Sequence, residues 1–257
     1  MAVGRPILAA ASLLILSGGI LLQFLTILSG AITSSPINQF YFLQASNLNS
    51  IPNARPESRW TFFAICGVDS SSGHNANCGS PVPALPFDPP RNFGSETNVP
   101  EGFLGTNKFF YLSRFMFAFY LIALFFAVCA LFTGALALCS RLGGLLSGLT
   151  TAIAFFFQAL AAALMTAWTV RGRNIFRSSG FDAHLGVKLY GFTWGAMACY
   201  LIATILFCVG GAIGRDSTSS SPMGRKGSTR SKRSKRSNRG SFFDADSQRR
   251  VKDDYSV

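Results

Sequence analysis

Charged residues are scarce in this chain of 257 residues, since Asp, Glu, Lys and Arg make up only 13% of it. An average soluble domain contains roughly 25% charged residues. Between its polar stretches run uninterrupted apolar segments that are longer than a soluble core requires. The scarcity of charge and these runs together exclude an ordinary soluble globular fold and indicate a membrane protein.

Catalytic and metal-binding motifs are also lacking. The chain has two histidines, His74 and His184, and neither has a nucleophile and an orienting acid at a recognisable spacing. The sequence contains no glycine-rich phosphate loop and no zinc signature. We therefore expect no enzyme activity, no cofactor and no metal. The formal net charge of +12 comes mainly from the C-terminal tail, so it does not indicate a nucleic-acid-binding surface.

Four apolar segments are long enough to cross a hydrocarbon core of roughly 30 Å, which takes about 20 helical residues. They predict an all-α membrane protein: a four-transmembrane-helix bundle with a small disulfide-closed, β-rich extracellular loop and a disordered basic cytoplasmic tail. The predicted order is a cytoplasmic N-terminus at 1–6, spans at 7–31, 111–138, 145–170 and 189–213, extracellular loops at 32–110 and 171–188, a cytoplasmic loop at 139–144 and the tail at 214–257.

Lysine and arginine near the span ends set the orientation, because cytoplasmic segments carry the excess of positive charge. The largest basic cluster lies in the tail, which predicts a multi-pass membrane protein with both termini in the cytoplasm. Arg171, Arg173, Arg177 and Lys188 fall in the short outer loop and count against this orientation. A cleaved signal peptide at the first segment is an alternative, although its apolar run exceeds the usual length of about 7 to 15 residues.

The long outer loop contains aromatic and β-branched residues that predict strands at 39–43 and 60–65. Its second half is rich in proline between Pro81 and Pro100, and proline lacks the donor that a sheet interior needs. We expect a small antiparallel sheet followed by an extended return to the second span. The loop has no Asn-x-Ser/Thr sequence, so no N-linked glycan is expected.

Cys66 and Cys78 are the only cysteines in this loop, and they flank a turn rich in glycine and serine. Extracellular pairs of this kind form disulfides, and a bridge of this length contributes about 3 kcal/mol by the loop-entropy estimate. A metal site with His74 is the alternative, although further ligands at suitable spacing are missing. We predict a disulfide-closed hairpin.

Several short segments of this loop resemble a known family. They are Phe40-Tyr41-Phe42-Leu43, Arg59-Trp60-Thr61 followed by Cys66-Gly67 and Cys78, Pro86-Phe87-Asp88-Pro89 and Asn92-Phe93-Gly94. With the four spans, the chain over roughly residues 5–213 is similar to the fungal cortical-patch tetraspans, the family of suppressor-of-Rvs protein seven and the pH-response regulator PalI. The claudin group is more remotely similar, since its first outer loop also carries a Trp and two Cys. The resemblance marks Trp60 and Gly67 as motif residues of the loop.

The resemblance implies a plasma-membrane protein of eisosomes, the furrow-like domains of the fungal cell cortex, with roles in membrane organisation, endocytosis and cell-wall integrity. It implies eisosome or cortical proteins as partners. The same resemblance allows an alternative, a sensor component of the ambient-pH response, for which His184 beside Asp182 is the titratable candidate. A channel or transporter is disfavoured, because the spans carry no ionisable group at mid-membrane depth.

Small residues mark where helices can approach closely in lipid. Gly144 with Gly148 and Gly191 with Gly195 form GxxxG motifs at the starts of the third and fourth spans, and the first two spans add the small-residue patches Ser17-Gly18-Gly19 and Gly134-Ala135. These motifs predict packing within one bundle, and association between copies into a homo-oligomer stays open.

Two glutamines and two aromatic runs also stand out in the spans. Gln23 and Gln158 are interpreted as hydrogen-bonding groups between helices. The aromatic runs at 115–126 and 155–157 predict lipid-facing or packing surface, with sterol contact as an alternative.

The tail from Arg225 to Arg239 has eight basic residues in fifteen and no acidic one, so we expect it to be disordered. Each Lys or Arg near an anionic leaflet contributes on the order of 1 kcal/mol, which predicts binding to phosphatidylserine or phosphoinositides. The basic residues are Arg225, Lys226, Arg230, Lys232, Arg233, Lys235, Arg236 and Arg239. Phosphorylation of Ser228, Ser234 and Ser237 would subtract charge and weaken this binding. A tail whose charge only fixes topology is the alternative.

Overall fold

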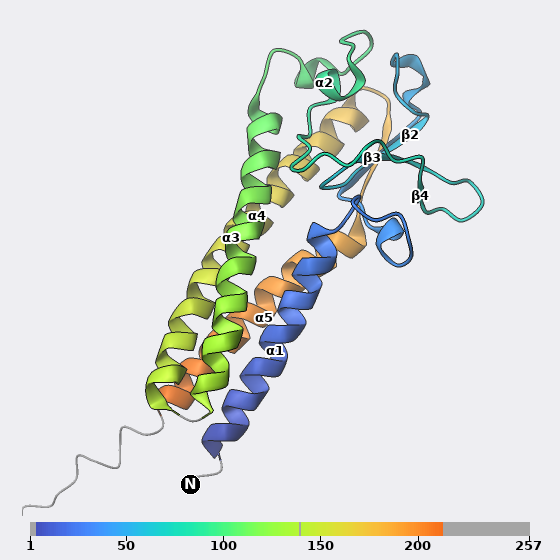
Figure 1. Ribbon diagram of the computed structural model, residues 1–257. Coiled ribbons are helices and arrows are strands. Elements are labelled where there is room, and N and C mark those ends of the chain that lie inside the picture. Colours follow the sequence, from blue (N-terminus) through green and yellow to red (C-terminus); the bar gives the residue numbers. More distant parts are fainter. Residues whose placement is uncertain (1–3, 139, 213–257) are drawn as a thin grey trace, which may run out of the picture. The chain divides into compact units, whose positions relative to one another are not determined.

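Four long helices dominate the computed structural model, which describes residues 4–138 and 140–212 (Figure 1). They are α1 (Gly4–Ile27), α3 (Lys108–Ala137), α4 (Arg141–Ser178) and α5 (Val187–Ala212). Each is long and apolar enough to cross a membrane. Each predicted span falls on one of these helices, which confirms the helical membrane bundle.

Two of the helices end at different places from the predicted spans. α1 ends at Ile27, before residue 31, and α4 continues past residue 170 to Ser178. The extension follows from burial, because Phe176 is fully enclosed while Arg177 on the next position is exposed. At 1.5 Å per residue, the 38 residues of α4 measure about 57 Å, which exceeds the thickness of the hydrocarbon core. One end of α4 therefore lies outside the membrane core.

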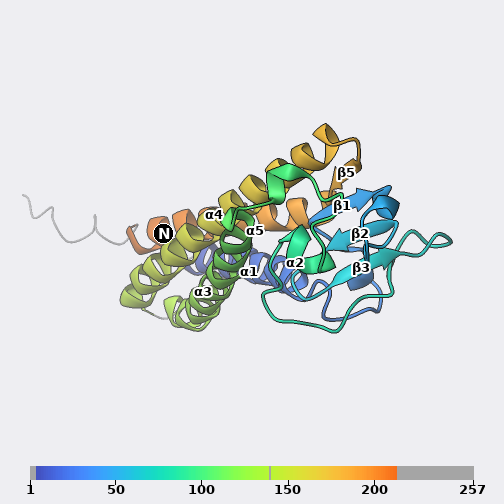
Figure 2. The same cartoon turned by 90° about the horizontal axis from the view of Figure 1, so that it is seen from above.

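In the described chain, the loops form one five-stranded antiparallel sheet in the order β4-β3-β2-β1-β5. The strands are β1 (Leu43–Ser46), β2 (Glu57–Trp60), β3 (Ile65–Val68), β4 (Asn75–Ala76) and β5 (Asp182–Leu185). Leu43 lies opposite Trp60 on β2 and Leu185 on β5. Because β5 comes from the short loop between α4 and α5, both outer loops build one unit. We call this unit, residues 28–107 and 179–186, the head; Figure 2 shows its strands side by side at one end of the helices.

The predicted strands at 39–43 and 60–65 are displaced from the observed ones. β1 begins only at the last residue of the first segment, and the middle of the second segment forms the turn between β2 and β3. In that turn the Thr61 hydroxyl donates to the Ala64 carbonyl and accepts from its N–H. Phe42 precedes β1 and is only 1% exposed. Phe40, Phe42 and Phe62 are buried but lie outside the strands, so these three aromatic residues fill the core and do not mark strand pairing.

The proline-rich return to α3 is predicted as extended, and part of it is helical instead. α2 (Pro89–Phe93) starts with two prolines, whose fixed φ suits a first helical turn and whose missing N–H is not needed there. The helix ends at Gly94 with φ of 65°, the left-handed conformation that glycine adopts without strain. Short 3-10 helices also occur in the head: η1 (Ile37–Gln39), η2 (Leu48–Ser50) and η3 (Glu101–Phe103).

Buried apolar side chains of the described residues form two clusters. The head cluster lies where the sheet meets the helices and is built mainly from aromatic rings, among them Phe42, Trp60, Phe62, Phe87, Trp168 and Phe176. The alanine cluster lies between the helices and contains Leu16, Ala127, Ala130, Ala137, Ala154, Tyr200, Ala203 and Phe207. The main helix contacts pair α3 with α4, α1 with α5 and α4 with α5.

Candidate functional site

The predicted disulfide is present, with an S–S distance of 1.97 Å between Cys66 and Cys78. Cys66 lies fully buried on β3, where it pairs with Arg59 of β2. The bridge ties the chain that follows β4 back onto the sheet. Both thiols are therefore used in a covalent bond, and neither serves as a metal ligand beside His74.

Trp60 stands at the centre of the head cluster and is only 2% exposed. Its indole N–H donates to Asn92 Oδ1 over 3.0 Å. The ring lies against Phe87, Phe93 and Phe176, with centroid distances of 5.1, 6.0 and 5.7 Å. A buried tryptophan needs such a partner for its N–H, because an unpaired donor is costly in an apolar environment. The tryptophan and the Asn-Phe segment, 32 positions apart in the sequence, thus form one structural unit.

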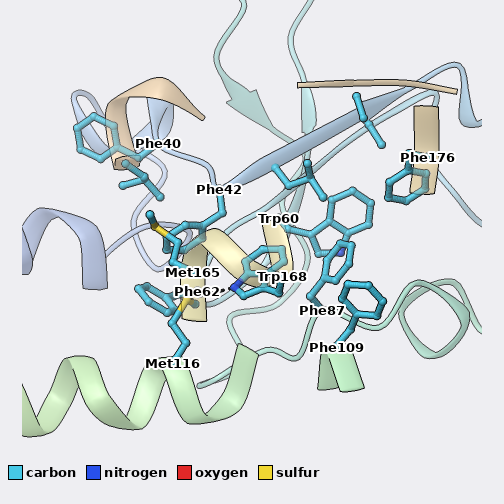
Figure 3. Packing of buried hydrophobic residues seen from close by; sticks show 14 of the residues in the cluster. Phe40, Phe42, Trp60, Phe62, Phe87, Phe109, Met116, Met165, Trp168 and Phe176 are labelled. Carbon is cyan, nitrogen blue, oxygen red and sulfur yellow. Dashed lines mark hydrogen bonds between the residues drawn. The ribbon is translucent and has the colours of Figure 1, made fainter. Parts of the chain in front are cut away.

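Trp168 of α4 joins the head cluster to the helices, as Figure 3 shows. Its ring centroid lies 4.7 Å from that of Phe87 and 6.0 Å from that of Phe42. Its indole N–H donates to the sulfur of Met116 on α3 over 3.2 Å. The head therefore shares a continuous core with α3 and α4. Sequence reasoning did not single out Trp168; a tryptophan near the end of an apolar run was the available signal.

Gly67 on β3 pairs with Ala76 of β4. A steric constraint explains why this motif position is glycine. A Cβ at this position would lie 3.1 Å from the Arg55 side chain and 3.4 Å from the Ala76 carbonyl oxygen. Arg55 passes over Gly67 so that its Nη1 can donate to the Ile65 carbonyl over 2.8 Å. Glycine leaves the room that this arginine occupies.

The structure places three of the four GxxxG glycines against a neighbouring helix. A Cβ on Gly144 would lie 3.7 Å from the Gly211 Cα, and one on Gly148 would lie 3.1 Å from the Cys208 sulfur, both on α5. A Cβ on Gly195 would lie 3.3 Å from Leu22 of α1. Gly191 differs, because a Cβ there would meet nothing within 4 Å.

Closer helix approaches occur at glycines outside the GxxxG motifs. A Cβ on Gly19 of α1 would lie 2.8 Å from the Tyr200 ring of α5, and one on Gly134 of α3 would lie 2.7 Å from Leu13. Both glycines belong to the small-residue patches that the sequence shows on the first two spans, Ser17-Gly18-Gly19 and Gly134-Ala135, and neither has GxxxG spacing. Spacing alone therefore ranks the contact glycines poorly.

Neutral polar groups link the helices near these contacts. Gln23 of α1 donates its side-chain N–H to the Tyr120 carbonyl over 2.7 Å and accepts from the Tyr200 hydroxyl. Gln158 of α4 donates to the Thr193 carbonyl over 3.2 Å. Both glutamines are fully buried, and their bonds connect α1 to α3 and α5, and α4 to α5.

Arg59 is a buried cation in the head, only 8% exposed. Its Nε donates to Gln44 Oε1 over 2.9 Å, and its Nη1 donates to the Gly73 carbonyl and to Asn75 Oδ1 over 2.9 and 3.1 Å. The guanidinium carbon lies 4.3 Å from the centre of the Tyr41 ring. Burial is the main cause that lowers the pKa of Arg59. The acceptors that hold this charge are thus all neutral.

The predicted lipid-binding residues and phosphorylation sites of the tail lie outside the described residues. His184 is described: it lies exposed on β5, paired with Gln44 of β1. Asp182 on the same strand accepts a hydrogen bond from Asn47 over 2.6 Å.

Four apolar helices capped by a disulfide-closed sheet define a class, the four-span membrane proteins with a folded loop domain. Within this class the model of the SUR7/PalI family matches residues 8–206, and the chain belongs to that family. The resemblance stated from the loop motifs is thereby confirmed.

The curated relatives agree. The chain is 38% identical to Protein SUR7 of Candida albicans over 202 residues, which cover 77% of this chain and 72% of the relative. It is 40% identical to SUR7 family protein FMP45 of Saccharomyces cerevisiae over 195 residues, 75% of this chain and 62% of the relative. It is 36% identical to the uncharacterized plasma membrane protein YNL194C of Saccharomyces cerevisiae over 200 residues, 76% and 65% of the two chains. The match thus spans less than two thirds of these last two relatives.

Proposed function

We propose that this protein is a structural organiser of a fungal plasma-membrane domain of the eisosome type, linked to cortical membrane organisation, endocytosis and cell-wall integrity. One observation carries the proposal: the bundle interior is packed and uncharged. On the four long helices, no Asp, Glu, Lys or Arg is buried among the described side chains. Coupled transport usually requires such groups at membrane depth, and a structural bundle does not.

The buried polar side chains of the helices support the same interpretation, because they are small or amide groups that hold helices together. They are Ser12, Gln23, Thr26, Ser113, Ser147, Thr151, Gln158, Thr169 and Thr193. Large apolar side chains such as Leu14, Phe125 and Phe132 point outward instead, with 74%, 63% and 71% exposed. This outer surface is available to lipid chains, to sterols or to a second copy of the chain.

The proposal includes the orientation of the protein in the membrane. We place both termini in the cytoplasm and the head outside the cell. Two features support this placement: the disulfide suits an oxidising compartment, and the basic tail suits the cytoplasmic side. In this orientation the tail meets anionic lipids or phosphoinositides of the inner leaflet, and cortical proteins of the eisosome are its expected neighbours.

Imaging of a fluorescently tagged full-length copy in fungal cells tests the proposal. We expect stable cortical patches that recover slowly after photobleaching. A uniform plasma-membrane signal with fast recovery would contradict the organiser. Replacing the eight basic residues of 225–239 by glutamine should loosen the patches, while a variant in which the lysines of that stretch become arginine retains the charge and should behave like the wild type.

A sensor of ambient pH is the second candidate, favoured by the PalI branch of the family name and by the exposed position of His184. It predicts an endosomal or uniform signal and a response to alkaline medium that requires this protein. His184→Gln should abolish that response if the imidazole is the sensing group. Patches in the wild type together with a normal alkaline response in the His184→Gln variant favour the organiser.

A further inference from the structure

A cavity of about 300 Å³ lies where the head meets the first turn of α5. Tyr41 contributes from the chain before β1, Arg59 from β2, His74 from the turn before β4, Gly186 from the position just before α5 and Lys188 from its first turn. This volume is at the small end of ligand pockets, which suits a compact group rather than a whole metabolite.

The lining of this cavity is one-sided in charge. Arg59 and Lys188 are cations, His74 offers ring nitrogens, and none of the residues that line the cavity is acidic. Glu57, on the same strand as Arg59, accepts a hydrogen bond from the Gln44 side chain, and its negative charge acts on Arg59 without direct contact. Among the described residues the only salt bridge joins Arg91 and Asp88, so Arg59 has no carboxylate within 4 Å.

Arg59 is the strongest indication of a missing partner. The residue as a whole is only 8% exposed, and the hydrogen bonds of its guanidinium use Nε and Nη1 with neutral acceptors only. Within the described part of the chain, Nη2 has no protein acceptor, and it is not enclosed by protein, so it can bond to a group that enters the cavity. A largely buried cation with no carboxylate in direct contact is costly, and an oxyanion that accepts from the guanidinium offsets this cost with short, charge-assisted bonds.

The start of α5 adds to the same preference. This helix has 26 residues, and its first N–H groups are free of intrahelical acceptors and carry the positive end of the helix dipole. The Lys188 ammonium lies here and donates to the Gln39 side chain, a neutral acceptor from the chain after α1. Cationic side chains and a helix start thus face one small cavity, an arrangement that binds phosphate in many proteins.

The cavity also lies at the end of a predicted membrane span. Val187 and Lys188, the first residues of α5, line it, and the apolar stretch of that helix begins at Val187. Phosphate groups of lipids lie at this boundary between hydrocarbon and water. We propose that the cavity binds a phosphate group, with Arg59 and Lys188 as the charged ligands and His74 as a hydrogen-bonding partner.

The bound phosphate group can belong to a lipid headgroup or to free phosphate in solution, and the experiment distinguishes these two ligands. Full-length protein in detergent is melted with inorganic phosphate or with chloride at matched ionic strength. Parallel melts use short-chain phosphatidic acid and short-chain diacylglycerol, which lacks the phosphate. Bound phosphate stabilises the folded protein by mass action, so the melting temperature should rise with phosphate and stay level with chloride.

Lys188→Gln is the main variant, because Lys188 is exposed and its loss should leave the fold intact. We expect its apparent phosphate affinity to fall about tenfold, the effect of losing one charge-assisted bond. Lys108→Gln removes an exposed cation at the start of α3, outside the cavity, and should bind like the wild type. Arg59→Gln should lose at least as much as Lys188→Gln where it folds.

The outcomes are distinct. Stabilisation by phosphatidic acid but not by diacylglycerol, lost in Lys188→Gln, supports a lipid headgroup as the source. Stabilisation by inorganic phosphate alone, with the same dependence on Lys188, supports a free anion. The proposal is overturned if neither inorganic phosphate nor phosphatidic acid raises the melting temperature above its control, chloride or diacylglycerol, or if Lys188→Gln and Lys108→Gln are stabilised equally.

Discussion

The head cluster and the alanine cluster hold the same chain together by different means. In the head cluster, Trp60 meets Phe87 edge to face with ring centroids 5.1 Å apart, and Phe87 meets Trp168 of α4 in a tilted arrangement at 4.7 Å. Between the helices, alanines such as Ala127 and Ala203 are fully buried beside Tyr200. The head faces water, so burying large apolar area stabilises it. Lipid offers no comparable drive between helices, so small side chains allow backbones to approach and gain dispersion contacts.

The same contrast appears in how each region treats polar groups. The head encloses a charged guanidinium, Arg59, and a hydrogen-bonded indole, Trp60. The bundle encloses neutral amides and hydroxyls, with Gln23 bonded to both Tyr120 and Tyr200. Water at the surface of the head can solvate the rest of a charged network, whereas hydrocarbon cannot. We therefore expect the head to be most sensitive to the loss of a large ring, and the bundle to be most sensitive to the enlargement of a small residue.

The largest expected effect follows from removing the central ring of the head. Trp60→Ala deletes a buried indole and removes one of the two donors to Asn92 Oδ1, which should destabilise the protein by about 3 to 5 kcal/mol. Trp194→Ala is the matched control, since Trp194 on α5 is 44% exposed and should cost far less. Equilibrium denaturation in detergent measures both. Equal losses of unfolding free energy in the two variants would contradict a central role of Trp60 in the stability of the protein.

Opening the disulfide should have the next largest effect. The Cys66→Ser, Cys78→Ser double variant removes a loop constraint that contributes about 3 kcal/mol, and the loss should fall on the head. We expect faster proteolysis within residues 28–107 while the helical content from circular dichroism stays unchanged. Cys129→Ser, at a free thiol on α3, is the control and should leave both measurements as in the wild type. A drop in helical content would show that the bundle depends on the bridge as well.

A glycine pair tests the bundle side of the comparison. Gly19→Ala places a Cβ 2.8 Å from the Tyr200 ring and should destabilise the protein by about 1 to 3 kcal/mol through overpacking. Gly191→Ala meets open space and should stabilise the helix by up to about 1 kcal/mol, because alanine is the better helix former. Unfolding titrations in mixed micelles measure both signs. A change in unfolding free energy of the same sign in both variants would contradict the difference in packing between Gly19 and Gly191.

Sequence reasoning reached the bundle more easily than the head, for physical reasons. An uninterrupted apolar run is required by the bilayer itself, so all four helices could be read from composition. The disulfide followed from the position of Cys66 and Cys78 in one outer loop. The strand β5 was missed because its partner β1 lies more than a hundred residues away, and Ser46 pairs with Asp182 through contacts that only the folded bundle creates. Long-range pairing of this kind leaves no local pattern.

The same limit applied to the site. Family resemblance marked Trp60 and Gly67 as motif residues. The contacts that explain them, the hydrogen bond of Trp60 to Asn92 and the passage of Arg55 over Gly67, are tertiary contacts that the sequence does not show. The helix-contact glycines were ranked by the GxxxG spacing, which selected Gly191 and gave less weight to Gly19. Spacing along one helix defines a face and does not say which neighbour covers it.

The smallest expected effect lies in the head, in a turn that belongs to neither cluster. The Asp69 carboxylate accepts from the hydroxyls of Ser72 and Ser71 over 2.6 and 2.7 Å, and these bonds lower its pKa from 3.8 to about 2. A lowered folded-state pKa stabilises the turn above pH 3.8, and this contribution is lost as the pH falls from 3.8 towards 2. An NMR titration should give a midpoint near 2, and Ser72→Ala should raise it towards 3.8. Because the carboxylate is exposed, the melting temperature should hardly respond, so a large acid-induced loss of stability in this window must come from another group.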